Sequence, residues 1–291
     1  MSTSLSQPAR NALRGASMAF PASLVVLLVF LVPLLILVRY SFNVYDPVDL
    51  MRSALSWSNY HKFFADPYYR RIFLNTLGIA ALCTVMALLL GLPVAYFLAR
   101  TQSRFKSLYV ILLVFPLMVG NVVRAAGWMI VFGNAGVLDS LARSVGMGPM
   151  HLLYTPTAVV VGTLAVVMPY MILTLQSVLE GVDFTLEEAA QILGAGTLIR
   201  LRRVLLPIIA PGIAAGTMLV FILCMNAYAT PVLLGGAGIT MMAPALYDQI
   251  AKASNWPFGA ALALVLVLGT LLMATLSSWL IHRRYRQTMS D

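Results

Sequence analysis

The sequence has few charged residues: Asp, Glu, Lys and Arg make up 10% of its 291 residues, whereas 60% are hydrophobic. A soluble domain of ordinary composition carries about 25% charged residues. This shortage excludes a water-soluble globular protein, because too few polar side chains remain to cover a surface exposed to water. The mean hydropathy of +0.89 leads to the same conclusion.

Catalytic and metal-binding patterns are also lacking. The two cysteines, Cys83 and Cys224, lie in apolar runs without CxxC or metal-ligand spacing, so we interpret them as small buried hydrophobes. The sequence has no HExxH motif, which disfavours an integral membrane enzyme, and we assign no catalytic or metal-binding residue. The three histidines all lie outside the apolar runs, at His61, His151 and His282. The phosphate cradle GxxxxGK followed by Ser or Thr is absent, so the sequence carries no P-loop for binding ATP.

Long uncharged runs, in contrast, are abundant. Four stretches hold no charged residue or histidine: residues 15–38, 72–99, 152–179 and 253–281. Each exceeds the ~20 residues that a helix needs to cross a bilayer. The first is too long for a cleaved signal peptide and is followed by no small-residue cleavage site.

Two further spans are less regular. The uncharged run 204–247 is too long for one helix, but its LLGGAGIT stretch (233–240) is typical of a loop, which leaves a helix of about 207–234. The remaining span begins after Lys106 and is interrupted by Arg124. We therefore expect an all-α integral membrane protein with six transmembrane helices.

The distribution of basic residues predicts the orientation. The net charge is +9, but Lys and Arg lie at the ends of apolar runs rather than in one patch, so we expect no nucleic-acid partner. With both termini in the cytoplasm, the inner segments hold Arg10, Arg14, Arg100, Arg104, Lys106, Arg200, Arg202, Arg203, Arg283, Arg284 and Arg286. The outer segments hold fewer: Arg39, Arg52, Lys62, Arg70, Arg71, Arg143 and Lys252. This excess on one side predicts cytoplasmic termini.

One charged stretch, EEAAQILGAGTLIRLRRVLLP (187–207), lies between the fourth and fifth spans. Thr185 and Glu188 have the spacing of a capping box, which predicts a helix that starts at Leu186 with acids at its positive end. Gly194 and Gly196 predict the end of this helix, with one of them in the left-handed conformation.

A second helix is expected to follow the glycines. Thr197 is a candidate cap for a basic amphipathic helix that lies along the lipid headgroups as far as Pro207. The first helix would present a small, mildly apolar face formed by Leu186, Ala189, Ala190, Leu193 and Thr197. Such a face favours docking against another protein; the alternative is a polar connector with positive-inside arginines.

Residues 188–207 resemble the EAA loop of binding-protein-dependent ABC importer permeases. Glu-Ala-Ala at 188–190, Gly194 and the closing Leu-Pro at 206–207 match its pattern, with Val204 in place of isoleucine. Residues 75–100 and 210–216 resemble other parts of the same permease domain. The resemblance covers about residues 71–281, with the EAA loop at 185–207. It leaves a cytoplasmic N-terminal tail (1–15), a first transmembrane helix with an outer segment (16–70) and a cytoplasmic C-terminal tail (282–291).

The resemblance implies an inner-membrane permease of bacteria that binds no cofactor itself. Its expected partners are a second permease subunit, two ATPase subunits that carry ATP and Mg, a periplasmic substrate-binding protein and membrane lipid. It further implies that a cytoplasmic coupling helix between spans four and five fits a cleft on the ATPase. The residues expected there are Thr185, Glu187, Glu188, Ala189, Ala190, Leu193, Gly194 and Ala195.

The substrate is less well defined. Residues 57–77, 121–139 and 226–236 resemble the spermidine/putrescine branch, whose members and relatives carry polyamines, other amines, amino acid-like compounds, phosphonates or metal-ion species. A polyamine path favours acidic and aromatic side chains, but no Asp or Glu lies in a span. The candidate pathway residues are the aromatic Trp128, Tyr170 and Tyr228 and the neutral polar Asn121, Asn134, Asn226 and Thr230.

Arg124 is the eighth candidate pathway residue, because it is the one charge expected inside a span and an intramembrane charge is a functional candidate. Seventeen uncharged residues separate it from Lys106, or about 26 Å of helix. This places it near the outer interface, where snorkelling or a gate salt bridge is favoured over substrate binding, unless the span breaks after FPLMVGN (115–121). The main alternative function is a free-standing secondary transporter, but that class needs an ion-coupling carboxylate within a span.

Overall fold

The computed structural model describes residues 7–146, 148–149 and 151–288, and these ranges are almost entirely helical. The helices are α1 (Gln7–Ser41), α2 (Ser58–Ala65), α3 (Pro67–Arg100), α4 (Lys106–Met118), α5 (Asn121–Phe132), α6 (Val137–Ser144), α7 (Pro156–Glu180), α8 (Thr185–Ile192), α9 (Thr197–Arg200), α10 (Leu206–Met225), α11 (Ala229–Gly235), α12 (Met242–Tyr247) and α13 (Trp256–Thr288). A π-helical segment, Leu201–Leu205, joins α9 to α10. The β-pairing described in these ranges is a single bridge between Val44 and Arg52.

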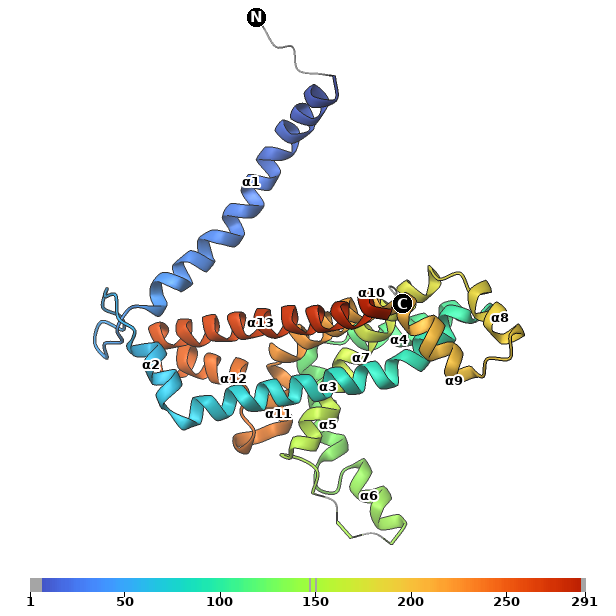
Figure 1. Cartoon of the computed structure of the whole chain (residues 1–291). Coiled ribbons are helices and arrows are strands. Elements are labelled where there is room, and N and C mark those ends of the chain that lie inside the picture. The colour runs from blue at the N-terminus through green and yellow to red at the C-terminus, as the bar shows by residue number, and fades with distance from the viewer. Residues whose placement is uncertain (1–6, 147, 150, 289–291) are drawn as a thin grey trace, which may run out of the picture.

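Within the described ranges, six segments are long and apolar enough to cross a membrane, which confirms the predicted all-α, six-span class (Figure 1). They are Ser23–Ser41, Pro67–Arg100, Asn121–Ser144, Pro156–Glu180, Thr197–Met225 and Trp256–Leu276. The third does not begin after Lys106 as predicted. Helix α4 has only 13 residues and ends at Met118, and the chain restarts as α5 at Asn121.

The predicted helix of about 207–234 is correct at its start but wrong at its end. Helix α10 begins at Leu206, continuous with the preceding residues from Thr197, and ends at Met225. Asn226 stops it because its side-chain Nδ2 donates to the carbonyl of Ile222 at 2.9 Å, in competition with the backbone. The predicted loop is also shorter than expected, since α11 continues to Gly235 and the turn comes at Gly236, where φ is +59°.

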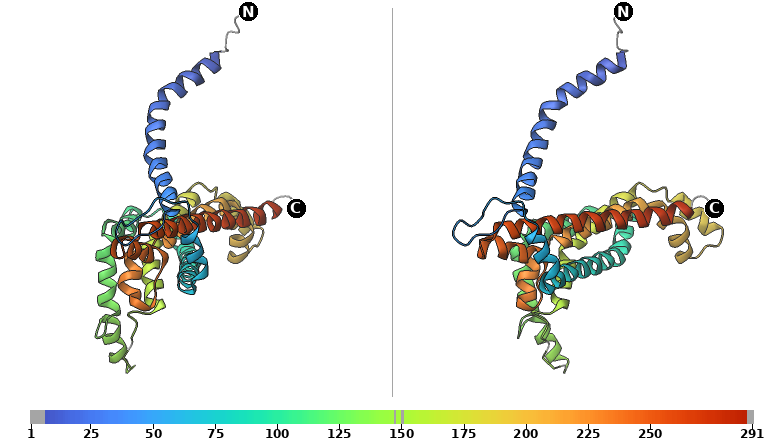
Figure 2. Two further views of the ribbon diagram at one scale, coloured as in Figure 1. Left: turned by 90° about the vertical axis from the view of Figure 1, so that its left-hand side faces the viewer. Right: turned by 60° about the vertical axis from the view of Figure 1, so that its left-hand side comes forward.

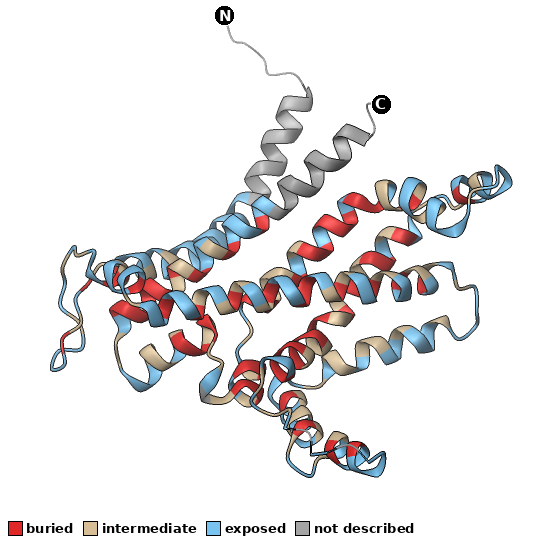
Figure 3. Ribbon diagram, turned by 60° about the horizontal axis from the view of Figure 1, so that its bottom comes forward, coloured by how far each residue is buried: buried red, intermediate tan, exposed pale blue. Residues whose placement is uncertain are grey.

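Helices α3, α7, α10 and α13 form the packed centre of the bundle (Figure 3). Close approach of α10 to α7 depends on Gly212, where an added Cβ would lie 2.5 Å from the side chain of Val178. Small residues at helix interfaces allow such contact in membrane proteins. Cys83 and Cys224 are free and fully buried in this centre, which confirms their interpretation as buried hydrophobes.

Helix α1 leans away from the bundle and touches it mainly through α13 (Figures 1 and 2). From Phe20 to Ser41, the exposed side chains described for α1 are almost all apolar, so this part of the helix has a surface suited to lipid. It begins at Gln7, so much of the expected N-terminal tail (1–15) is helical, and α13 likewise extends to Thr288 in the expected C-terminal tail (282–291). Residues 1–6 and 289–291 lie outside the described residues.

The two ends of the bundle carry different elements (Figure 1). Helix α2 and the segment 42–57 lie at one end, with the first turn of α13. Helices α8 and α9 lie at the other end, beside the last turn of α3. The EAA loop is thus separated from the segment 42–57 by the full length of α3.

Candidate functional site

The EAA loop (185–207) starts with a turn that differs from the predicted capping box. The Thr185 amide donates to the Asp183 carboxylate at 3.0 Å, and α8 begins at Thr185, one residue before the predicted start. Hydrogen bonds from Thr185, the backbone amide above all, lower the pKa of Asp183 below its ordinary value. Thr185 makes no capping bond to Glu188 because it already lies within the helix, with Phe184 at the cap position.

The end of α8 agrees with the prediction. Gly194 has a φ of +83°, the left-handed conformation expected for one of the two glycines. The Ala195 amide donates to the Ala190 carbonyl at 3.0 Å, and the Gly194 amide donates to Gln191 at 2.9 Å. These two bonds form a Schellman motif, which satisfies carbonyls at the helix end.

The second half of the loop is not a separate surface helix. Gly196 occupies the cap position of α9 and Thr197 is its first residue, without a capping bond. The chain then passes through the π turn 201–205 directly into α10. A π turn is suited to this place because the ring of Pro207 would clash with the preceding turn of a regular α-helix.

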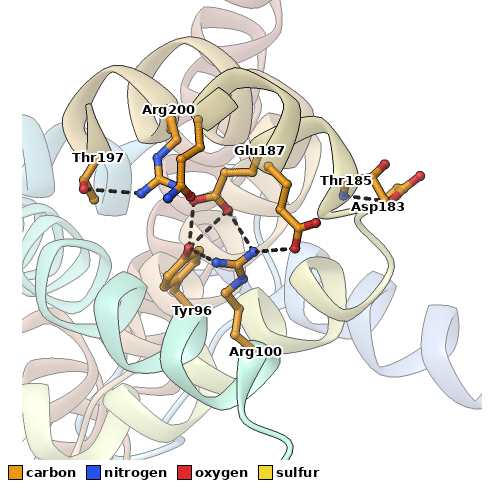
Figure 4. A network of polar contacts seen from close by, with 9 residues as sticks. Tyr96, Arg100, Asp183, Thr185, Glu187, Thr197 and Arg200 are labelled. Atoms are coloured by element: carbon orange, nitrogen blue, oxygen red, sulfur yellow. Dashed lines mark hydrogen bonds and ion pairs between the residues drawn. The ribbon is translucent and has the colours of Figure 1, made fainter. Parts of the chain in front are cut away.

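The two acids of α8 have opposite environments. Glu187 is 4% exposed, whereas the side chain of Glu188 is 66% exposed. The Tyr96 hydroxyl of α3 lies 2.9 and 3.1 Å from the two carboxylate oxygens of Glu187. Arg100 and Arg200 flank the same carboxylate at 3.7 and 3.8 Å (Figure 4). Glu187 therefore bonds within the chain, although the sequence places it in the docking set.

The outer surface of α8 is apolar and exposed. Leu186 is 52% exposed, and Ile192 and Leu193 are each 87% exposed. Thr185, Ala189 and Gly194 are exposed too, whereas Ala190 and Ala195 are half-buried. Exposed apolar side chains next to an exposed acid form a surface suited to another protein.

A cavity of about 410 Å³ lies where two helices are interrupted. It sits between the start of α5, the middle of α7 and the break between α10 and α11. Its polar lining is Asn121, Thr163, Tyr170, Asn226, Tyr228 and Thr230, and its apolar lining is Val122, Val166, Val167, Leu223, Ala227 and Ala229. None of these lining residues is charged. Interrupted helices line substrate sites in many transporters, because their ends expose backbone polar groups.

Five of the eight predicted pathway residues meet in this cavity: Asn121, Tyr170, Asn226, Tyr228 and Thr230. The other three lie elsewhere. Trp128 stacks on Phe132, with ring centroids 5.0 Å apart. Asn134 contacts the imidazole of His151 at 3.1 Å.

Arg124 bridges the interruption between α4 and α5. Its guanidinium donates to the Pro116 carbonyl at 2.9 Å and also to the Asn121 side chain. A cation is stabilised at the carboxyl end of a helix, where the free carbonyls carry negative partial charge. The helix is interrupted between Met118 and Asn121, which agrees with the expected break of the span near residues 115–121, and the guanidinium bonds within the chain at this break.

Thr163 is a cavity residue that the sequence analysis missed. It is 2% exposed, and its hydroxyl has no hydrogen-bond partner among the described residues. Six other threonines of the long helices donate to a carbonyl four residues earlier: Thr76, Thr84, Thr174, Thr217, Thr270 and Thr275. No motif marks Thr163, since only the cavity distinguishes it from these threonines. Tyr96 and Arg100 were missed for a similar reason, because their partner Glu187 lies 91 residues from Tyr96.

The fold and these two regions define the class: a helical membrane protein with an exposed loop at one end and a polar cavity between interrupted helices. The family model described as "Binding-protein-dependent transport system inner membrane component" matches residues 84–286. The chain belongs to this family and is therefore an inner-membrane permease component of a transport system, which is not itself catalytic.

Similar proteins agree with this assignment. The chain is 33% identical to the spermidine/putrescine transport system permease protein PotB of Haemophilus influenzae, over 84% of this chain and 85% of that protein. It is 32% identical to PotB of Escherichia coli, over 85% and 91% of the two chains. A bacterial alginate ABC transporter, solved in complex with an alginate-bound periplasmic protein, has the same fold. That match has a TM-score of 0.78 at 14% identity and covers 96% of this chain and 97% of the other.

Proposed function

We propose that this chain is a permease subunit of an ABC importer for a small polar solute that bears amino groups. A periplasmic binding protein delivers the solute, and a second permease subunit completes the pathway. Two ATPase subunits bind ATP and Mg and dock on the EAA loop. In this arrangement the α8 end of the bundle and both termini face the cytoplasm.

The coexistence of the exposed EAA loop with the cavity carries this proposal. The loop offers a partner an exposed apolar helix, whereas the cavity offers a solute hydrogen bonds in the middle of the bundle. The cavity is partly open, which fits a pathway that a second permease closes. Glu188, Leu193 and Gly194 are the loop residues that we assign to ATPase docking.

The relatives support an amine as the solute, since those with 32–33% identity are spermidine/putrescine permeases. The rings of Tyr170 and Tyr228 line the cavity and can hold an ammonium group through their faces. The hydroxyls and amides around them can accept hydrogen bonds from the same group. Amino acid-like solutes with one ammonium group would use the same contacts.

A secondary transporter is the competing function. Such a protein needs a group that binds the coupling ion inside the membrane, and an intramembrane carboxylate is the usual choice. The cavity lining contains none. This absence favours a permease whose energy comes from ATP hydrolysis in a partner.

Uptake by the complete transporter tests the proposal. The chain is reconstituted into liposomes with the second permease, ATPase and binding protein of its own system. Putrescine, spermidine, a neutral amino acid and a phosphonate are then supplied with and without internal ATP. We expect ATP-dependent uptake of an amine. Uptake that follows an ion gradient without ATP would establish the secondary transporter instead, and ATP-dependent uptake of the phosphonate alone would refute the solute class.

A further inference from the structure

The neighbouring acids Glu187 and Glu188 point in different directions from α8. Within α8, Glu187 is the one buried residue, and the side chain of Glu188 is mostly exposed. Arg100 reaches Glu188 only at 3.9 Å, and an exposed ion pair of this kind stabilises a structure little. Glu188 thus remains accessible to a partner, whereas Glu187 does not.

Side chains from two other helical segments, α3 and the run formed by α9 and α10, contact the Glu187 carboxylate. The Tyr96 hydroxyl and the Arg100 guanidinium come from the last turns of α3, at 2.9 and 3.7 Å from the carboxylate. Arg200 comes from α9, which is continuous with α10, and lies 3.8 Å away. The carboxylate is therefore a point at which α3, α8 and the α10 run are joined (Figure 4).

The two arginines are themselves held in position. Arg100 donates to the Tyr96 hydroxyl at 3.1 Å and lies 4.6 Å from the centroid of the Phe184 ring. Arg200 donates to Gln191 and, at 3.3 Å, to Thr197, so it also links the end of α8 to the start of α9. The two guanidinium groups attract the Glu187 carboxylate as ion pairs at 3.7 and 3.8 Å. The Tyr96 hydroxyl donates to the same carboxylate at 2.9 Å, and a hydrogen bond to a charged group is stronger than a neutral one. A fixed arginine on each side makes this joint stiff.

We propose that Glu187 is a positioning residue that transmits movement of α8 to α3 and α10, whereas Glu188 serves the ATPase contact. The proposal rests on the proposed function, because it assumes that the ATPase moves α8. The Glu187 carboxylate couples that movement to two of the four helices that form the packed centre. Helix α10 lines the cavity and packs against α7, which lines it too. Through α10, the joint therefore connects the loop to the proposed solute pathway.

The test compares Glu187→Gln with Glu188→Gln in the complete transporter in liposomes. Two quantities are measured for each variant. One is the ratio of solute imported to ATP hydrolysed, and the other is the amount of ATPase that the purified complex retains. Glu187→Gln removes the charge from the joint, so we expect normal ATPase retention and a ratio lowered by about tenfold. Glu188→Gln should instead weaken ATPase retention while the bound complexes keep their ratio.

Two further variants separate transmission from folding. Tyr96→Phe keeps all the charges but removes the hydrogen bond that the hydroxyl donates to Glu187 and the one that it accepts from Arg100. We expect a ratio of solute imported to ATP hydrolysed that is lowered by about threefold. Glu187→Asp keeps the charge and should recover part of the ratio lost in Glu187→Gln. Glu180→Gln is the matched control. It removes a carboxylate that pairs with Lys106 at 2.8 Å at the same end of the bundle, but outside α8, and its ratio should stay within twofold of wild type.

Two results would overturn the inference. One is a normal ratio in both Glu187→Gln and Tyr96→Phe, which would limit Glu187 to a structural role. The other is loss of ATPase retention in Glu187→Gln, which would place Glu187 at the ATPase contact. A wild-type chain that retains no ATPase would refute the proposed function itself, so the two failures are distinguishable.

Discussion

The EAA loop and the cavity differ in the charge of their side chains. The loop concentrates acids and arginines around one buried carboxylate, whereas the cavity is lined by amides, hydroxyls and phenols without a charged group. A buried carboxylate is stable only when partners surround it, and Glu187 has three. A charge in the cavity would have no such partners when the solute is absent. The difference fits the proposed fixed joint in one region and the proposed transient solute site in the other.

Introducing a charge into the cavity should have the largest effect. Thr163→Asp buries a carboxylate among neutral groups, and a charged residue at the centre of a span costs about 2.5–3.5 kcal/mol. We expect loss of most of the folded complex or of its uptake. Thr163→Asn is the neutral control of similar shape and should retain both. Size-exclusion profiles and uptake assays measure the two effects, and equal behaviour of the two variants would show that charge in the cavity is harmless.

The left-handed turn of the loop should be the next most sensitive position. Gly194→Val places a β-branched residue at a φ of +83°, which costs about 1–3 kcal/mol. The Schellman motif should open and coupling should fall strongly while the protein still inserts. Gly196→Ser is the control, because Gly196 has a φ of −66° at a cap position that suits serine. ATP-dependent uptake of both variants checks this, and similar losses would remove the turn from the account.

Removing the free hydroxyl from the cavity should have a moderate effect. We expect Thr163→Val to raise the KM for uptake by about three- to tenfold, because the solute loses one hydrogen bond. Stability should hardly change, since this hydroxyl has no hydrogen-bond partner among the residues that the structure describes. Thr217→Val is the matched control, because the Thr217 hydroxyl donates to its own helix. A KM raised equally by both changes would contradict a role for Thr163 in solute binding.

The smallest effect concerns pH. The pKa of Asp183 lies below its ordinary value of 3.8, chiefly because its carboxylate accepts from the Thr185 amide. A lowered pKa in the folded state stabilises the turn at pH above the ordinary value, and this contribution disappears as the pH falls through the folded pKa. Between pH 5 and pH 2, the melting temperature of Asp183→Asn should therefore fall less than that of the wild type. An equal dependence of the melting temperature on pH in the two proteins would contradict the bond between the Thr185 amide and the Asp183 carboxylate.

The sequence predicted much of this arrangement but not its long-range contacts. Hydropathy was sufficient for six spans, and the glycine pattern for the turn at Gly194. The interruption after Met225 was not predicted, because Asn226 ends the helix through a side-chain bond to Ile222 that hydropathy does not record. The capping box at Thr185 failed because Asp183 competes for the same turn.

The sequence also predicted part of the cavity lining, but not all of it. The costly exposure of neutral polar groups to lipid pointed to Asn121, Asn226 and Thr230 in the cavity. The expectation of aromatic faces for a cation pointed to Tyr170 and Tyr228. Trp128 and Asn134 have the same residue types but pack elsewhere, and only the fold separates them. The helix now seen at Thr185–Ile192 was predicted as a unit. The division between Glu187 and Glu188 was not, because it depends on Tyr96 and on the two arginines that flank Glu187.

Labelling of the EAA loop tests the central claim most directly. Ile192 is 87% exposed, and the native cysteines are fully buried, so Ile192→Cys gives one reactive thiol. A membrane-impermeant maleimide is applied to spheroplasts and to inverted membrane vesicles, with and without bound ATPase. The account predicts labelling in inverted vesicles alone, and protection when the ATPase is bound. Labelling in spheroplasts, or equal labelling with and without ATPase, would contradict it.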